Sequence, residues 1–415
     1  MEDSAPVVVV GAGMVGVSCA LYLQRSGCNV LLIDRDKPGS GATYGNACTI
    51  SRYGCIPINQ PTLPGKLPKL LLRKNQPLAV SWTYLPRMIP WLWQFLNHCR
   101  RNRSLQIAQS LASLLRYAEG AALSLFNSAH TQRLLKRQGL LSVYSSTRNY
   151  NIDEPNRHLR QQLLGHDLIE LNRGEISELE PALSERYQHG YLYSQCLHLL
   201  DPQQMSQQLV EEFCHAGGEF ISDDITTIGA PSADRLQLSG EQTVYNASQI
   251  VIAAGAWSRR FLTTPLESLP LDTERGYHVL FPDDGSTINR VIGLVDEGFF
   301  MAPMAHGLRA AGTVELAGLD APANSTRTHY IETQTRLALP TLGRSTSTWL
   351  GFRPTLPDSL PVIGRSRQLP NVIFAFGHQH LGITLAGITG QLVSEIATGR
   401  TPSIDLAPFD SARFA

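Results

Sequence analysis

The chain has 415 residues, of which 43% are hydrophobic and 17% charged, and its formal net charge is zero. This is an ordinary globular composition with room for two or three domains and a large core. The charge balance argues against nucleic-acid binding, which normally requires a strongly basic domain. The start, Met1-Glu-Asp-Ser, is acidic and runs directly into an apolar segment. We therefore expect no secretory signal and a cytoplasmic location.

The N-terminal segment has the pattern of a strand, a glycine turn, a helix and a second strand. Val7–Val10 is a continuous β-branched run, which is typical of a strand buried on both faces. A helix is predicted over Val15–Ser26, with Gly27 as its C-cap. Asn29–Ile33 has the pattern of a second buried strand and is closed by Asp34. Together these elements predict a βαβ unit.

Three glycines, Gly11, Gly13 and Gly16, lie between the first strand and the helix. In this context Gly11 permits a tight turn, Gly13 lets the backbone approach a pyrophosphate, and Gly16 allows close helix–strand packing. The helix N-terminus offers free N–H groups to that pyrophosphate. Asp34 ends the second strand and can accept hydrogen bonds from ribose hydroxyls. The pattern predicts a cofactor that contains ADP, without distinguishing NAD from FAD.

Beyond this unit, helical and strand patterns alternate in an order that divides the cofactor fold. Helices are predicted over 104–126, 155–180 and 383–398, strands over Leu140–Tyr144 and Ile250–Ala253, and a strand-rich stretch over 276–315. The α/β pattern returns at Asp201–Asp224. We expect a cofactor domain formed by residues 1–60, 196–262 and 340–415, and a substrate domain formed by 61–195 and 263–339.

No Asp or Glu occurs between Lys37 and Ala118, whereas basic and aromatic residues recur. They are Lys66, Lys69, Arg73, Lys74, Arg87, Arg100, Arg101 and Arg103, with Trp82, Tyr84, Trp91, Trp93 and Phe95 between them. One interpretation is a set of substrate-domain helices packed on a sheet. The other is a surface that makes a peripheral contact with an anionic membrane, such as the inner membrane, through basic residues and interfacial aromatics. No apolar run is long enough to span a bilayer.

Segments along the whole chain resemble one family. They are Val7–Arg35, Ser40–Ala47, Ile250–Ser258, Gly351–Pro354 with Pro357–Gly364, and Phe376–Gly390. In order and spacing they resemble the glutathione-reductase-type FAD superfamily, in its D-amino-acid oxidase and dehydrogenase branch, and are most similar to bacterial D-amino-acid dehydrogenases. The resemblance implies FAD and an α/β fold. It also implies a Rossmann-like FAD-binding domain of discontinuous segments, with an α+β substrate domain that has a mainly antiparallel sheet.

Several of these segments suit contact with FAD. Ser40–Cys48 is a small, Gly-rich loop that can surround diphosphate and ribityl groups, and Ala254–Gly255 ends a strand where a side chain would meet the cofactor. In this family the helix that begins at Gly382 points its N-terminus at the flavin pyrimidine, where its dipole stabilises negative charge. The expected FAD contacts are Gly11, Gly13, Met14, Val15, Gly16, Asp34, Arg35, Gly41, Ala42, Thr43, Asn46, Ala47, Cys48, Ile225, Ala254, Gly255, Trp257, Gly377, His378, His380, Leu381, Gly382, Ile383 and Thr384.

The cysteine and histidine positions bear on how the flavin is held. The seven cysteines include no CxxC pair, which fits reduced core residues better than disulfides or a metal site. The Ser40–Cys48 loop has no His, and no Cys follows Cys214, so both attachment points that relatives use for a covalent flavin are missing. We expect non-covalent FAD and no metal. A disulfide reductase is excluded, because the chain has neither a second GxGxxG nor a CxxxxC pair.

The resemblance also implies the chemistry. In the family the Arg of the G-x-R-P motif, here Arg353, grips the substrate carboxylate, which a planar guanidinium can do bidentately. The alternative is an Arg that braces the sheet through backbone carbonyls. Tyr277 and His380 are candidate polar residues of the same pocket, each with a structural role as its alternative. The implied reaction is hydride transfer from Cα of a D-amino acid to flavin N5, followed by hydrolysis of the imine.

Where many relatives read Gly-His-Gly before the last helix, this chain reads Gly377-His-Gln-His-Leu-Gly382. The added bulk and polarity favour a cyclic substrate such as D-proline or hydroxy-D-proline. The basic, aromatic segment favours a dehydrogenase that passes electrons to an acceptor of the respiratory chain. Two alternatives remain open: an oxygen-using amine oxidase of the glycine or sarcosine oxidase type, and a non-catalytic flavoprotein module.

Overall fold

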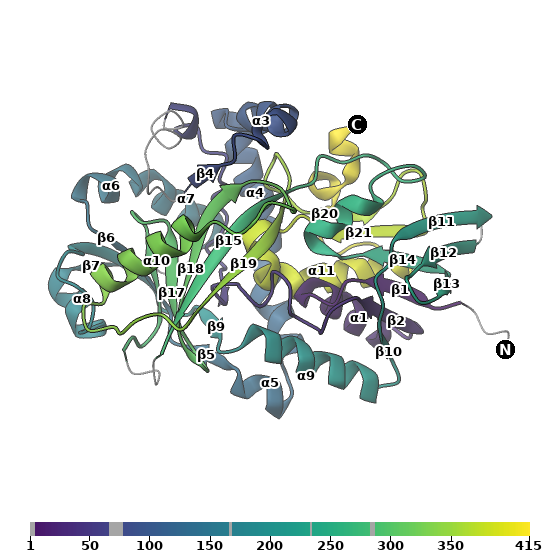
Figure 1. Ribbon diagram of the computed structural model, residues 1–415, viewed down its shortest axis with the longest axis horizontal. Coiled ribbons are helices and arrows are strands. Elements are labelled where there is room, and N and C mark those ends of the chain that lie inside the picture. The colour runs from purple at the N-terminus through teal and green to yellow at the C-terminus, as the bar shows by residue number, and fades with distance from the viewer. Residues whose placement is uncertain (1–4, 66–77, 166–167, 233–234, 283–286) are drawn as a thin grey trace.

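The computed structural model describes residues 5–65, 78–165, 168–232, 235–282 and 287–415. Its cofactor-type sheet has six strands in the order β10, β2, β1, β14, β21, β20, parallel except for the β21–β20 pair (Figure 1). Their bounds are Glu219–Ser222, Val30–Asp34, Val7–Val10, Gln249–Ile252, Val372–Phe376 and Val362–Arg365. Lys66, Lys69, Arg73 and Lys74 of the basic segment lie outside the described residues.

The order of these strands places a crevice beside β1. The chain leaves β1 through a helix to β2 on one side, and β14 returns to β1 from the other side. The connections after β1 and β14 therefore diverge, which is where α/β sheets bind their ligands. Two backbone hydrogen bonds fix this end of the sheet, from Gly11 to Ile33 and from Ala253 to Val10.

Four helices cover one face of the six-stranded sheet in two layers. α1 (Met14–Arg25), α9 (Pro202–His215) and α11 (Gly382–Ala397) pack near the strands, and α4 (Arg101–Leu125) packs on α11. The other face carries the 3₁₀ helix η1 (Gly255–Phe261) and a small antiparallel sheet. That sheet consists of β11 (Thr227–Ser232), β12 (Arg235–Ser239) and β13 (Val244–Ala247). The alternating Val side chains of β1 thus enter two different cores.

The second large sheet is mainly antiparallel and lies beside the first (Figure 1). Its order is β19 (Ser347–Thr355), β15 (Asp272–Phe281), β18 (Gly307–Leu316), β17 (Phe299–Met304), β16 (Val291–Leu294), β6 (Leu140–Tyr144), β8 (His189–Tyr193), β7 (Leu168–Asn172), with β4 (Leu78–Val80) paired to β18. Helix α10 (Ser325–Ala338) covers one face. β19 belongs to this sheet, so the domain boundary expected at residue 340 cuts across it.

The remaining elements lie outside these three sheets. They are β3 (Thr49–Ile50), β5 (Leu135–Arg137) and β9 (Leu197–Leu199), the helices α3 (Leu85–His98), α5 (Ala129–Arg133), α6 (Thr147–Ile152), α7 (Glu154–Leu164) and α8 (Arg173–Leu179), and the 3₁₀ turns η2 (Gln379–Leu381), η3 (Ala407–Phe409) and η4 (Ser411–Phe414). Within the described residues, no helix is long and apolar enough to cross a membrane.

The structure confirms the predicted α/β class and the N-terminal βαβ unit. The continuous helix predicted over 155–180 is wrong, because strand β7 separates α7 from α8. Gly165 ends α7 in the left-handed conformation, with φ 63°, and Asn172 starts α8 with a capping box to Glu175. These two signals interrupt the amphipathic pattern.

Close packing of α11 on α4 depends on the absence of a side chain at Gly387. A Cβ there would lie 2.7 Å from the Ala121 carbonyl carbon. We expect Gly387→Ala to lower the free energy of unfolding by about 1–3 kcal/mol, because the helices must separate. Gly120→Ala, at an exposed α4 position with no atom within 4 Å of the new Cβ, is the matched control and should stabilise by about 1 kcal/mol. Urea unfolding of both variants measures the change in the free energy of unfolding. An equal change in the two variants would contradict the packing argument.

Candidate active site

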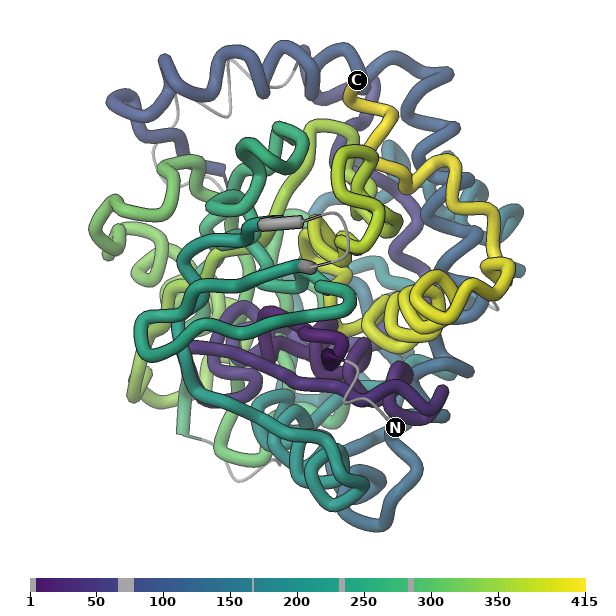
Figure 2. Tube along the Cα trace, turned by 90° about the vertical axis from the view of Figure 1, so that its right-hand side faces the viewer, coloured from purple at the N-terminus to yellow at the C-terminus, as the bar shows by residue number. Residues whose placement is uncertain are grey.

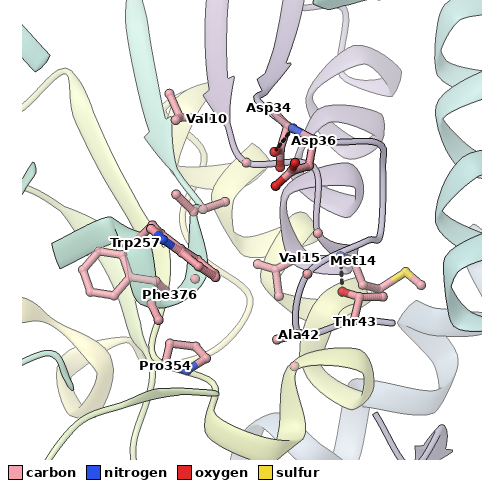
Figure 3. A pocket seen from close by; sticks show the side chains of 18 of the residues that line it. Val10, Met14, Val15, Asp34, Asp36, Ala42, Thr43, Trp257, Pro354 and Phe376 are labelled. Carbon is pink, nitrogen blue, oxygen red and sulfur yellow. Dashed lines mark hydrogen bonds between the residues drawn. The ribbon is translucent and has the colours of Figure 1, made fainter. Parts of the chain in front are cut away.

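A cleft with an empty volume of about 1150 Å³ follows the carboxyl ends of the parallel strands (Figure 3). Its walls come from the β1–α1 turn, the ends of β2, β10 and β21, the loop over 39–46, η1 and the start of α11. Segments that are far apart in sequence therefore meet at the crevice beside β1. The predicted cofactor residues that line the cleft are Gly11, Gly13, Met14, Val15, Asp34, Arg35, Gly41, Ala42, Thr43, Asn46, Ile225, Ala254, Gly255, Trp257, His378, Gly382 and Ile383.

The glycines of the first turn have distinct roles. Gly11 has φ 108°, and a Cβ on it would lie 2.6 Å from the Ala253 carbonyl oxygen. A Cβ on Gly16 would lie 1.8 Å from the Gly11 oxygen, so both positions are closed by neighbouring backbone. A Cβ on Gly13 would meet only Thr43 Oγ1, at 3.5 Å. Gly11 and Gly16 thus shape the turn, while Gly13 leaves its backbone open to the cleft.

Two helix N-termini open onto the cleft. α1 begins after Gly13 and α11 after Leu381, and neither has a side-chain N-cap or an acidic residue in its first turn. The Met14 N–H donates to Thr43 Oγ1 at 3.0 Å (Figure 3). Each N-terminus presents N–H groups and a partial positive charge. An elongated anionic ligand with negative charge at two separate places fits this arrangement.

Asp34 is held in a fixed orientation at the end of β2. Its Oδ2 accepts from the Ala12 N–H at 2.6 Å and its Oδ1 from the Asp36 N–H at 2.9 Å. Burial raises the pKa of the Asp34 carboxyl, while these two hydrogen bonds oppose the rise. Across the cleft, the Arg35 guanidinium lies 4.6 Å from the ring centre of Trp257. This end of the cleft can therefore offer a carboxylate to hydroxyl groups and a flat, cation–π wall to a ring.

Seven predicted cofactor residues do not line the cleft: Gly16, Ala47, Cys48, Gly377, His380, Leu381 and Thr384. Thr384 ties the first turn of α11 to β3, because its Oγ1 accepts from the Ser51 N–H and donates to the Thr49 oxygen. Gly377 has φ 85° and makes room for Leu356. Thr384 and Gly377 therefore help to position the backbone around the cleft.

Arg353 lies on β19 opposite Glu274 of β15. Its Nη1 donates to the Thr313 oxygen at 2.8 Å and its Nη2 to the Gly312 oxygen at 3.4 Å. Burial lowers the pKa of Arg353, and the Glu274 charge opposes this. Burial raises the pKa of Glu274, and Arg353 opposes that change in turn. Arg353 therefore braces the sheet through backbone carbonyls, and the buried carboxylate of Glu274 lies near its positive charge.

His380 is brought into the electrostatic range of Arg353. Its side chain is accessible to solvent yet densely surrounded by protein. Burial lowers the pKa of His380 to about 4, and the positive charge of Arg353 lowers it further. Both effects favour the neutral form of the imidazole.

The added residue Gln379 fixes the turn that carries His380. It is buried with φ 49°, and its Nε2 donates to Thr355 Oγ1 at 2.9 Å and to Ser359 Oγ at 3.3 Å. Thr355 Oγ1 donates to Glu274 Oε1 at 3.2 Å. A hydrogen-bonded chain therefore joins this turn to the carboxylate near Arg353.

Tyr277 does not join this group. Its side chain lies on the α10 side of the sheet, where its hydroxyl donates to Glu315 Oε2 at 2.5 Å and accepts from the Asn324 N–H. Successive residues of a strand point to opposite faces. The next residue, His278, faces the other side and stacks on Trp349, with ring centres 5.2 Å apart. Neither Tyr277 nor His278 lines the cleft, so the site role expected for Tyr277 has no support from this arrangement.

Other cleft residues were missed by the sequence prediction. They are Val10, Ile33, Asp36, Lys37, Gly39, Ser40, Asp223, Asp224, Ala253, Ala256, Arg260, Phe261, Phe352, Pro354, Ala375, Phe376 and Gln379. Many of these residues lie at or just after the carboxyl end of a parallel strand. The predicted strands could therefore have been used to identify them. Arg260 and Asp224 form an ion pair at 2.6 Å in this wall. Within the described residues, no cluster of His, Cys, Asp or Glu could hold a metal.

Comparisons with known proteins show the family of this chain. The model of the FAD dependent oxidoreductase family (DAO) matches residues 6–396. The chain belongs to this family. A D-amino-acid oxidase from Bradyrhizobium diazoefficiens is 33% identical over the full length of both chains. Glycine oxidase from Geobacillus kaustophilus has a TM-score of 0.74 at 19% identity, covering 99% of each chain. L-proline dehydrogenase from P. horikoshii has a TM-score of 0.74 at 17% identity, covering 100% of this chain and 98% of that one.

The cofactor of this FAD dependent oxidoreductase is FAD. The residues present fit it: an open Gly13, a fixed Asp34 and two uncapped helix N-termini along one cleft. In such a site α1 would hold the pyrophosphate and α11 the flavin end.

We expect Asp34→Asn to weaken FAD binding by about 10- to 100-fold, because its amide NH₂ would face one of two backbone N–H donors. Titrating the apoprotein with FAD and following flavin fluorescence measures this. Asp320→Asn is the control, since the Asp320 side chain is exposed and does not line the cleft. Equal affinities for both variants would contradict the role of Asp34.

Proposed function

We propose that this FAD dependent oxidoreductase oxidises a D-amino acid to its imine and passes the electrons to a quinone-type acceptor rather than to oxygen. The observation that carries the proposal is the position of Arg353, which two backbone carbonyls hold on β19 between Phe352 and Pro354, both of which line the cleft. FAD, when bound, supplies the hydride acceptor at N5. The FAD is held non-covalently.

Arg353 would bind the substrate carboxylate. Its bonds to Thr313 and Gly312 fix the guanidinium plane, so the remaining N–H groups point in set directions. A planar donor held this way orients a carboxylate and with it the Cα–H bond. Glu274 balances the charge of Arg353 while the site is empty of substrate. An incoming carboxylate would take over part of that balance.

His380 would receive a hydrogen bond from the substrate amine. Hydride loss from Cα requires an amine with a free lone pair, so the ammonium must give up a proton. Because the pKa of His380 is about 4, its ring is neutral and can accept at a nitrogen. A carboxylate on Arg353 would remove part of the repulsion that lowers this pKa, so substrate binding would make His380 a stronger base.

The substrate class follows from the turn between Gly377 and Gly382. Gln379 is held by hydrogen bonds to Thr355 and Ser359, and His380 adds a polar side chain to the turn that precedes α11. We propose a secondary, cyclic amine, D-proline or hydroxy-D-proline, which presents one N–H₂⁺ group to His380. A second candidate is an oxygen-using oxidase, which the name of the Bradyrhizobium relative favours.

In an anaerobic screen, D-proline and hydroxy-D-proline should bleach the flavin absorbance faster than D-alanine, D-arginine, glycine or sarcosine. Arg353→Met should slow this reduction by about 10- to 100-fold, through loss of a charge-assisted hydrogen bond. Stopped-flow absorbance measures both. Faster bleaching by D-alanine or D-arginine would overturn the substrate class, and no bleaching by any compound would favour a non-catalytic flavoprotein.

Two further variants separate binding from folding. Arg353→Met leaves Glu274 without its cation, so the double variant with Glu274→Gln should recover stability but not flavin reduction. Tyr277→Phe loses the bond to Glu315 on the opposite face of the sheet. It should lower the melting temperature while leaving the substrate KM unchanged.

With the best substrate, reduction of a soluble quinone should exceed peroxide formation at least tenfold. The acid-free, aromatic segment before Ala118 supports an acceptor located in a membrane. Parallel assays of quinone reduction and peroxide, with one enzyme preparation, measure the ratio. Peroxide formed at the rate of flavin reduction would establish the oxidase alternative instead.

A further inference from the structure

Helix α3 is an outermost element of the molecule (Figures 1 and 2). Its inner face carries Met88, Trp91 and Phe95, which are buried on a small core with Leu316 of β18. This contact covers one side of the helix and leaves the other side to be explained. A surface helix held in this way normally has a polar outer face.

The outer face of α3 is apolar. Trp93 is 69% exposed and Ile89 59%, and Leu96 follows on the same side at helical spacing. Pro86, one turn before Ile89, and Pro90, just after it, are exposed as well. Trp82, just before the helix, is also exposed. A contiguous apolar surface of this kind on a protein that has a proper core marks an interaction site.

Positive charge surrounds this face at both ends. Arg87 is exposed in the first turn, and Arg100, Arg101 and Arg103 are exposed just beyond the last. None of the four forms an ion pair with another described residue. The sequence supplies no acidic residue anywhere from Lys37 to Ala118. The partner must therefore be apolar at its centre and negative around it.

We propose that the outer face of α3 docks on an anionic lipid bilayer. Ile89, Trp93 and Leu96 would enter the boundary between headgroups and acyl chains, and the arginines would contact the headgroups. A second copy of the chain fits less well, because a symmetric contact would bring the same unpaired arginines together. This surface stands on its own residues and does not depend on the substrate proposed above.

The docking helix is firmly joined to the catalytic half of the molecule. The Phe95 oxygen accepts from Asn59 Nδ2 at 3.2 Å, and the same amide donates to the Pro357 oxygen at 2.9 Å. Before the helix, the Tyr84 hydroxyl donates to the Asp272 carboxylate at 3.0 Å. Both connections reach strands or loops that hold Arg353. Docking through α3 would therefore fix the orientation of the cleft relative to the membrane.

The test is co-sedimentation of the full-length, FAD-loaded protein with vesicles. The protein should pellet with phosphatidylglycerol–phosphatidylethanolamine vesicles, much less with phosphatidylcholine, and less as NaCl rises. Ile89→Ser with Trp93→Ser should weaken binding at least tenfold. Arg100→Gln, Arg101→Gln and Arg103→Gln together should weaken it about 100-fold.

Matched controls keep the experiment specific. Leu337→Ser alters a residue that is 50% exposed on α10, and Arg148→Gln, Arg336→Gln and Arg344→Gln remove three exposed charges elsewhere. Both controls should bind vesicles like the unaltered chain. All variants should reduce the flavin with substrate at the same rate, so a failure here is distinguishable from a failure of the proposed function.

Three outcomes would overturn the proposal. The first is equal binding to phosphatidylcholine, the second is unchanged binding of both α3 variants, and the third is a loss in the controls as large as in the variants. A dimer in sedimentation velocity that the α3 variants dissociate, without vesicle binding by the unaltered chain, would assign the face to a second copy instead.

Discussion

The close approach of the Gly11 turn to the Ala253 backbone is the contact on which the cofactor site depends. It leaves no space for a side chain at Gly11 or Gly16, so α1 begins directly against the end of β1. The position of α1 then sets that of α11, because Gly390 packs on the backbone of Ser18. Two helix N-termini are thereby aligned along one cleft, without any charged side chain to place them. Backbone dipoles supply the positive potential there.

In the second sheet the charges belong to side chains and not to backbone dipoles. Arg353 is buried among carbonyl groups with Glu274 nearby, and each shifts the pKa of the other toward its charged form. A buried cation is costly unless it is paired, so the pair keeps Arg353 ionised while its carbonyl bonds restrain it. The sequence left two roles open for this arginine, binding the substrate carboxylate and bracing the sheet through backbone carbonyls. One geometry of the side chain is compatible with both roles.

Much of the fold was predictable because its signals are local. The β-branched run at Val7–Val10, the glycines after it and the Asp34 that closes β2 lie within one βαβ unit, and each has a direct physical reason. The face on which Tyr277 lies was not predictable. It depends on the register of β15 against β18, which shifts near Thr313 at φ 57°. Strand alternation shows that neighbours point apart, but only tertiary pairing shows which face of the sheet each one occupies. Gln379 likewise became intelligible only through Thr355 and Ser359, which are distant in sequence.

The discontinuous six-stranded sheet also has a consequence for how the protein matures. β1 and β2 are made first, yet β14 and β21 and the helix α11 come from the second half of the chain. During synthesis the glycine turn therefore waits, without its neighbours, until nearly the whole chain has left the ribosome. A nascent fragment that ends before β21 and α11 lacks part of the wall of the cleft. We therefore expect FAD to bind only after the last strands of the sheet have paired.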